Sequence, residues 1–117
     1  TIVGPVISER CKPELRNHTI ETAGVLNKAG VPMCICTDHP VVPEQYLPLS
    51  AGLAVRGGLD RDEALKAITI YPAQITGIAD RVGSIEPGKD ADIVIFSGDP
   101  LSVCDTPDTV IINGKVI

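Results

Sequence analysis

The stretch that decides the fold is Cys34-Ile35-Cys36-Thr37-Asp38-His39-Pro40, in which an apolar run ends in an aspartate, a histidine and a proline. The apolar segment from Val31 to Thr37 is predicted to be a strand. Because side chains alternate along a strand, Cys34, Cys36 and Asp38 are expected on one face. This pattern places Asp38 at the carboxyl end of the strand, where enzymes built on parallel sheets and barrels hold their catalytic groups.

The segments on either side of this strand alternate in type. A first strand is predicted over residues 2–8, and the apolar spacing over residues 13–29 predicts a helix that stops at Gly30. Further helices are predicted over residues 47–55, from a cap at Asp60 to Pro72, and from Pro72 to about residue 78. Short strands are predicted over residues 82–85 and 91–96 and in a hairpin over residues 110–117, with Asn113-Gly114 as its turn.

This order predicts an α/β part, residues 1–79, and a small all-β part, residues 80–117. Strands that alternate with helices indicate parallel strands with helical crossovers, which are right-handed in almost every protein. Since two parallel strands cannot bury both of their faces, the α/β part is expected to be a piece of a larger sheet or barrel. The start at Thr1, without an initiator methionine, also indicates a fragment or processed piece.

Composition narrows the classes of function. The chain has 117 residues, of which 44% are hydrophobic and 21% charged, as in globular domains. A formal net charge of -5 gives no basic surface for nucleic acid or anionic membranes. The apolar runs are far shorter than the roughly 20 residues of a spanning helix. Four cysteines without a paired C-x-x-C set are expected to be reduced thiols in a cytoplasmic protein.

Four segments carry a resemblance to a known family. They are Thr37-Asp38-His39-Pro40 after an apolar strand, a helix at Pro72-Ala73, the stretch from Val82 to Val94 (VGSIEPGKDADIV), and the closing Val110-x-x-Asn113-Gly114-Lys115. Together they resemble the carboxyl-terminal part of the metal-dependent amidohydrolase superfamily, and within it the imidazolonepropionase-like and related cyclic-amide hydrolases. The stretch GSIEPGKDADIVIF, which begins at Gly83, is highly specific.

The resemblance implies a fold and an activity. It implies the last two β/α units, strands seven and eight, of a (β/α)8 TIM-type barrel, followed by the carboxyl-terminal part of a small β-sandwich-like domain. The implied reaction is hydrolysis of C–N bonds other than peptide bonds, in a small molecule of the cyclic amide or amidine type, with a divalent metal, zinc by expectation. Asp38 would be the metal-binding and proton-transferring aspartate of strand eight. His39 would contact the substrate, contact the residues that bind the metal or the substrate, or lie in the loop.

The chain has two histidines and no His-x-His pair, so most ligands of such a metal site must lie elsewhere in the full-length protein. The fragment alone is therefore expected to be inactive. A second reading makes the chain a non-catalytic folding or assembly module that self-associates through exposed barrel edges. A third, the weakest, is a thiol enzyme that uses Cys11 with His18.

Several of these residues also have purely structural readings. An aspartate before a proline at the end of a strand is often a turn former. Cys34 and Cys36 on an apolar strand are expected to fill the core rather than bind a metal. Asp90 and Asp92 are expected to end a turn and start a strand.

Overall fold

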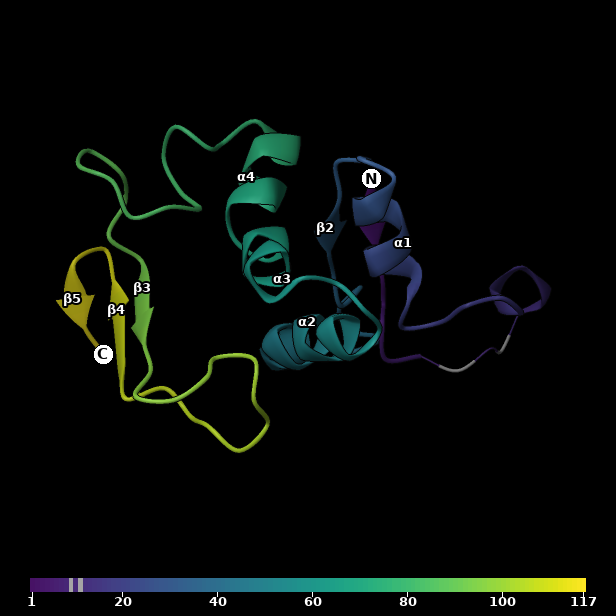
Figure 1. The fold of residues 1–117 in the computed structure, drawn as a ribbon. Coiled ribbons are helices and arrows are strands. Elements are labelled where there is room, and N and C mark those ends of the chain that lie inside the picture. Colours follow the sequence, from purple (N-terminus) through teal and green to yellow (C-terminus); the bar gives the residue numbers. More distant parts are fainter. Residues whose placement is uncertain (9, 11) are drawn as a thin grey trace.

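The computed structural model describes residues 1–8, 10 and 12–117 (Figure 1). Two strands, β1 (Ile2–Val3) and β2 (Cys34–Ile35), pair in parallel, as the sequence predicted. Between them lie the 3-10 turn η1 and the helix α1, and after β2 come η2, three helices and a separate antiparallel sheet of order β3-β4-β5. Their bounds are η1 Pro13–Leu15, α1 Thr22–Lys28, η2 Glu44–Tyr46, α2 Leu47–Arg56, α3 Arg61–Ala67, α4 Ile70–Thr76, β3 Ile93–Ile95, β4 Thr109–Ile112 and β5 Lys115–Val116.

The segment predicted as one helix over residues 13–29 is divided in two. Thr19 lies between η1 and α1, and its carbonyl and hydroxyl oxygens accept hydrogen bonds from the Thr22 hydroxyl and the Glu21 amide. Short polar side chains of this kind offer the backbone partners outside a helix, which explains the interruption. The single-helix prediction was therefore wrong in its first half.

Other boundaries also differ from the prediction. The strand predicted over residues 82–85 is a turn, because Gly83 has a φ of 93° and the Val82 amide donates to the carbonyl of Ile78. The helix that begins after Asp60 ends at Ala67, before Pro72. Pro72 lies in the first turn of α4, where its missing N–H costs no helical hydrogen bond.

Three helices end in the same way. At the end of α1, the Val31 amide donates to Leu26 and the Gly30 amide to Asn27, with Gly30 at a φ of 71°. This is the Schellman arrangement, which favours glycine because the position is left-handed. It confirms Gly30 as the helix stop, and the same pair of bonds occurs at Gly58 and Gly77.

The sheet of β3 to β5 lies close to the strand predicted over residues 91–96 and the hairpin predicted over residues 110–117. Asn113 and Gly114 have φ values of 49° and 75°, the two positive angles of a type I′ hairpin turn. Asp92 accepts a hydrogen bond from the Asn113 amide at 2.8 Å, and Asp90 pairs with Arg81 at 2.6 Å. The structural reading of these two aspartates is confirmed.

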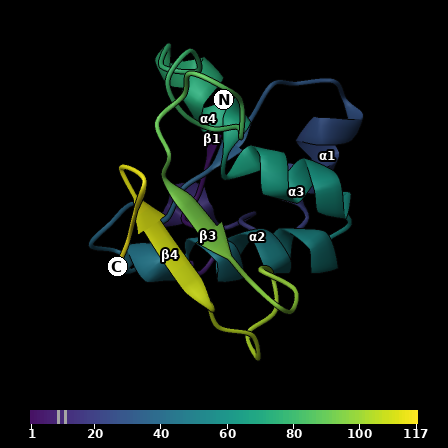
Figure 2. The same ribbon diagram turned by 90° about the vertical axis from the view of Figure 1, so that its left-hand side faces the viewer.

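The core lies between the parallel strands and the helices and is built largely from small residues. Ala51, Ala54, Ala64 and Ala67 are fully buried where α2, α3 and β2 meet. Leu101, from the loop between β3 and β4, joins this core. Figures 1 and 2 show the three-stranded sheet on one side of α2 to α4, while β1, β2 and α1 lie on the other. Of the helices in the described residues, none is long and apolar enough to cross a membrane.

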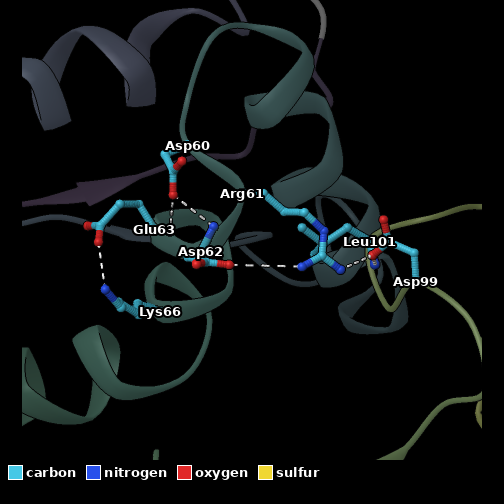
Figure 3. A network of polar contacts seen from close by, with 7 residues as sticks. All are labelled: Asp60, Arg61, Asp62, Glu63, Lys66, Asp99 and Leu101. Atoms are coloured by element: carbon cyan, nitrogen blue, oxygen red, sulfur yellow. Dashed lines mark hydrogen bonds and ion pairs between the residues drawn. The ribbon is translucent and has the colours of Figure 1, made fainter.

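An ion pair ties the β3–β4 loop to α3 (Figure 3). Arg61 Nη2 lies 2.8 Å from Asp99 Oδ1, and the same carboxylate oxygen accepts the Leu101 amide at 2.9 Å. Gly52 of α2 leaves room for this loop, since a Cβ there would lie 2.5 Å from the Leu101 carbonyl oxygen. The loop that carries Leu101 into the core is thus held from two helices.

The Glu63 side chain joins three helices. Asp60 caps α3 by accepting the Asp62 and Glu63 amides, as predicted. The Glu63 carboxylate turns away from the cap, and its bonds to Lys66 (2.8 Å), Tyr71 (2.7 Å) and Asn27 (3.2 Å) link α3 to α4 and α1. The Lys66 ammonium, followed by the Tyr71 hydroxyl, holds the pKa of Glu63 below its ordinary value of 4.5.

Because the folded-state pKa of Glu63 is lowered, its ionised form stabilises the fold above about pH 4.5, and that contribution is lost as the pH falls through the lowered value. Glu63→Gln should lower the free energy of unfolding at pH 7 by about 1 kcal/mol or less, the range of partly exposed pairs. The gap between wild type and variant should close toward pH 3 in denaturant titrations. Glu44→Gln, at an exposed position, is the control, and a gap that stayed constant from pH 7 to pH 3 would contradict the assignment.

Candidate functional site

The carboxyl ends of β1 and β2 lie at the same edge because the two strands are parallel. The ladder extends beyond the strands proper, since the Cys36 amide donates to the Val3 carbonyl at 2.9 Å. Asp38 follows two residues later, as the sequence predicted for a residue at the end of this strand. The chain segments after β1 and after β2 therefore leave the sheet side by side.

Asp38 does not continue the side-chain line of Cys34 and Cys36. Its φ is 54°, in the left-handed region, so the extended alternation has ended before it, and the expectation of one continuous face was wrong. The Asp38 carbonyl accepts the Val41 amide at 2.8 Å, which closes a tight turn. Thr37 and Val42, on either side of this turn, are 7% and 6% exposed and anchor it.

A left-handed aspartate is uncommon, and such residues are concentrated at functional sites. Both Asp38 and its neighbour His39 are exposed. Within residues 1–8, 10 and 12–117, no hydrogen bond or ion pair occupies the Asp38 carboxylate. Asp38 is thus an exposed residue at the edge where the strands end.

The described residues contain no group of three or more His, Cys, Asp and Glu side chains that could hold a metal ion. Asp38 can supply one hard oxygen ligand, which suits a divalent metal, while the remaining ligands must come from outside these residues. The donor present fits part of a metal site. His39 follows Asp38 in the chain and is also exposed. Among the described residues it belongs to no group of side chains that could hold a metal ion.

The segment after β1 is fixed from two sides. Gly4 lies against Cys36, so closely that a Cβ at Gly4 would overlap the Cys36 carbonyl oxygen. His18 Nε2 lies 2.9 Å from the Pro5 carbonyl oxygen and donates to it. The sequence suggested His18 only as the partner of Cys11 in the thiol-enzyme reading, and its contact with Pro5 was not predicted.

Of the three cysteines that the structure describes, Cys34 is buried, Cys36 is half-buried and Cys104 is exposed, so the core position expected for Cys34 and Cys36 is confirmed for Cys34 alone. Cys34 is 4% exposed, and burial, with a smaller contribution from Cys36, raises the pKa of its thiol above the ordinary value. Cys34, Cys36 and Cys104 are free thiols. Cys11, named in the thiol-enzyme reading, lies outside the described residues.

A cavity of about 520 Å³ among the described residues lies away from Asp38. It lies between α1, α3, α4 and the segment that enters β2, which includes Val31 and Met33. That is the amino end of the parallel strands, opposite the edge that carries Asp38. In its lining, the Tyr71 hydroxyl and the Asn27 amide both donate hydrogen bonds to the Glu63 carboxylate.

Comparison with known proteins gives a consistent family. A model of the Amidohydrolase family matches residues 6–117. The amidohydrolase tasK of Hapsidospora irregularis is 35% identical over 103 residues, which cover 88% of this chain and 10% of that protein. An imidazolonepropionase of Geobacillus kaustophilus is 47% identical over 72 residues, which cover 59% of this chain and 17% of the relative.

Solved structures also match this chain over most of its length. A crystal structure of an amidohydrolase from Thermotoga maritima matches 99% of this chain with a TM-score of 0.94 and 42% identity, and the match covers 30% of that chain. A Xaa-Pro dipeptidase with methionine bound in its active site matches 86% of this chain, with a TM-score of 0.74 and 26% identity, over 26% of its own length. The chain thus spans between 10% and 30% of the length of these four proteins.

Proposed function

The chain belongs to the amidohydrolase family, and we propose that it is the carboxyl-terminal part of a metal-dependent hydrolase that cleaves C–N bonds other than peptide bonds. The observation that carries the proposal is the position of Asp38, an exposed aspartate in a left-handed turn at the carboxyl end of a parallel strand. Barrel enzymes carry their chemistry at this end of the strands. The family is typically metal-dependent, and the Asp38 carboxylate is a suitable ligand for a divalent metal.

A cyclic amide or amidine is the proposed substrate class. The proposal is supported by the relatives named imidazolonepropionase, among them one that is 41% identical over 70 residues, from Thermoplasma acidophilum. The solved dipeptidase is less similar in sequence. The substrate-binding groups lie mainly in loops outside this chain, so the substrate class rests on similarity and not on a pocket.

The architecture that goes with this function is a barrel. We assign β1 and β2 to strands seven and eight of a (β/α)8 barrel, residues 1–79 to the barrel part and residues 80–117 to a small composite β domain. Two features support the assignment: the parallel pairing of β1 and β2, and the separate antiparallel sheet of β3 to β5.

In this site Asp38 would hold a divalent metal ion, zinc by proposal, together with ligands from the rest of the protein. When bound, this metal would supply Lewis-acid chemistry and would lower the pKa of a bound water. The Asp38 carboxylate accepts the proton that the attacking water loses. It then delivers this proton to the nitrogen that leaves when the C–N bond breaks. A contact of His39, next in the chain, with the substrate is part of the proposal.

Asp38→Asn in the full-length enzyme tests the role of the carboxylate. Asparagine tolerates the left-handed backbone, so the substitution removes charge and basicity without adding strain. The kcat should fall by about 10²–10⁴-fold, the usual worth of general acid–base catalysis, while the free energy of unfolding changes by less than about 2 kcal/mol.

Asp80→Asn, at an exposed position in a loop, is the matched control and should keep wild-type kcat. If the metal-loaded Asp38→Asn enzyme kept normal turnover, Asp38 would be a turn former only. The isolated chain should have no activity in either form.

A second candidate function, self-association as an assembly module, is favoured by apolar side chains that the isolated chain leaves exposed. Ile2 on β1 is 61% exposed, and Val116 and Ile117 at the end of the small sheet are 71% and 79% exposed. Unpaired strand edges with such side chains are templates for pairing with another chain.

The isolated chain should therefore form a dimer or larger species that buries more than about 1,000 Å², the lower limit of stable interfaces. Light scattering over a concentration series measures the molar mass and therefore the oligomeric state. A monomer at high concentration would show that the helices and the small sheet cover the strands well enough, and would remove the support for an assembly module.

A further inference from the structure

We propose that Gly4 is a positioning residue for Asp38 and that it acts through the backbone of Cys36. The inference rests on the proposed function, because it assigns Gly4 to the same site. Gly4 follows β1 directly, and Cys36 follows β2, so the two meet at the edge of the sheet where Asp38 lies.

The contact leaves no room for a side chain. A Cβ on Gly4 would overlap the Cys36 carbonyl oxygen and would lie 2.9 Å from its Sγ and 3.0 Å from its carbonyl carbon. Real Cβ atoms essentially never approach other heavy atoms closer than 3.0 Å, so an added methyl group requires a displacement on the order of 1 Å in this closely packed region. The nearest atom belongs to the backbone, and a change of side-chain rotamer cannot relieve the overlap.

The displacement must pass to the strand that carries Asp38. On its own side, Gly4 is followed by Pro5, whose carbonyl oxygen is held by His18, and by Val6, which is 6% exposed. This segment has little freedom to retreat. Cys36 is hydrogen-bonded to Val3 through its amide, and its carbonyl begins the short connection to Asp38.

A shift of this size matters for catalysis more than for folding. Misplacement of a catalytic group by about 1 Å can cost on the order of 10²-fold in rate. Gly4 also has a φ of 153°, which side chains rarely adopt, so part of any effect of substitution is backbone strain alone. A suitable control is a glycine that also has a positive φ but lacks the contact.

Gly30 is that control. It has a φ of 71°, a Cβ added to it would meet no heavy atom within 4 Å beyond its chain neighbours, and it precedes β2 at the end opposite Asp38. In the full-length, metal-loaded enzyme, Gly4→Ala should lower kcat by about 10- to 100-fold with KM changed less than about threefold. Gly30→Ala should lower the melting temperature but keep wild-type kcat.

Three results overturn the proposal or its premise. Wild-type kcat in folded Gly4→Ala, with Asp38→Asn inactive, would overturn the role of Gly4 alone. Wild-type kcat in Asp38→Asn would overturn the proposed function itself. An equal loss of kcat in Gly4→Ala and Gly30→Ala would reduce the effect to backbone strain.

If Gly4→Ala fails to fold, Cys36→Leu is the second variant. It enlarges the side chain whose Sγ lies 2.9 Å from the position of a Gly4 Cβ, and it leaves Gly4 itself unchanged. It should show the same loss of kcat at nearly constant KM. Wild-type kcat in the folded Cys36→Leu enzyme would contradict the proposal. Zinc titration of the metal-free full-length variants gives a second readout, and weaker binding is expected in Gly4→Ala than in Gly30→Ala.

Discussion

The parallel hydrogen bonds between β1 and β2 determine where the rest of the chain lies. They run from the Cys34 amide to Thr1 and from the Cys36 amide to Val3, each at 2.9 Å. Because the strands are parallel, both carboxyl ends reach one edge, and the connection between them must cross over through α1. The tight turn at Asp38 and the close approach of Gly4 to Cys36 both depend on this pairing.

The helices are held against these strands by small side chains. Alanines at the contacts of α2 and α3 let the backbones approach closely, and Leu101 fills the remaining space from the β3–β4 loop. The Arg61–Asp99 pair and the Glu63 contacts fix this arrangement with charges that are at least partly exposed, so the apolar contacts contribute more of the stability. Because Leu101 lies in the β3–β4 loop, its packing in the core also holds the small sheet beside the helices.

Much of the fold could be predicted from the sequence, since its signals are local. The Asn113-Gly114 turn, the Asp60 cap and the Gly30 helix stop each depend on neighbouring residues and were found. The position of Asp38 after an apolar strand was also visible. Its left-handed backbone was not, because the alternation of a strand gives no sign of where the strand ends.

What the sequence could not show depends on contacts between distant segments. The meeting of Gly4 with Cys36 is set by tertiary packing, and so are the hydrogen bonds that Glu63 forms with Tyr71 and Asn27. None of these has a periodic pattern. The metal ligands that would complete the site lie outside the described residues, so neither pattern nor packing within them can supply those groups.

The central claim is that Asp38 binds a divalent metal in the full-length protein. Anomalous diffraction at the zinc absorption edge, from crystals of the zinc-loaded full-length protein, tests it most directly. We predict an anomalous peak about 2.0–2.2 Å from an Asp38 carboxylate oxygen, the usual zinc–oxygen distance. A fully occupied zinc site elsewhere in the protein, with the Asp38 carboxylate facing solvent, would contradict it.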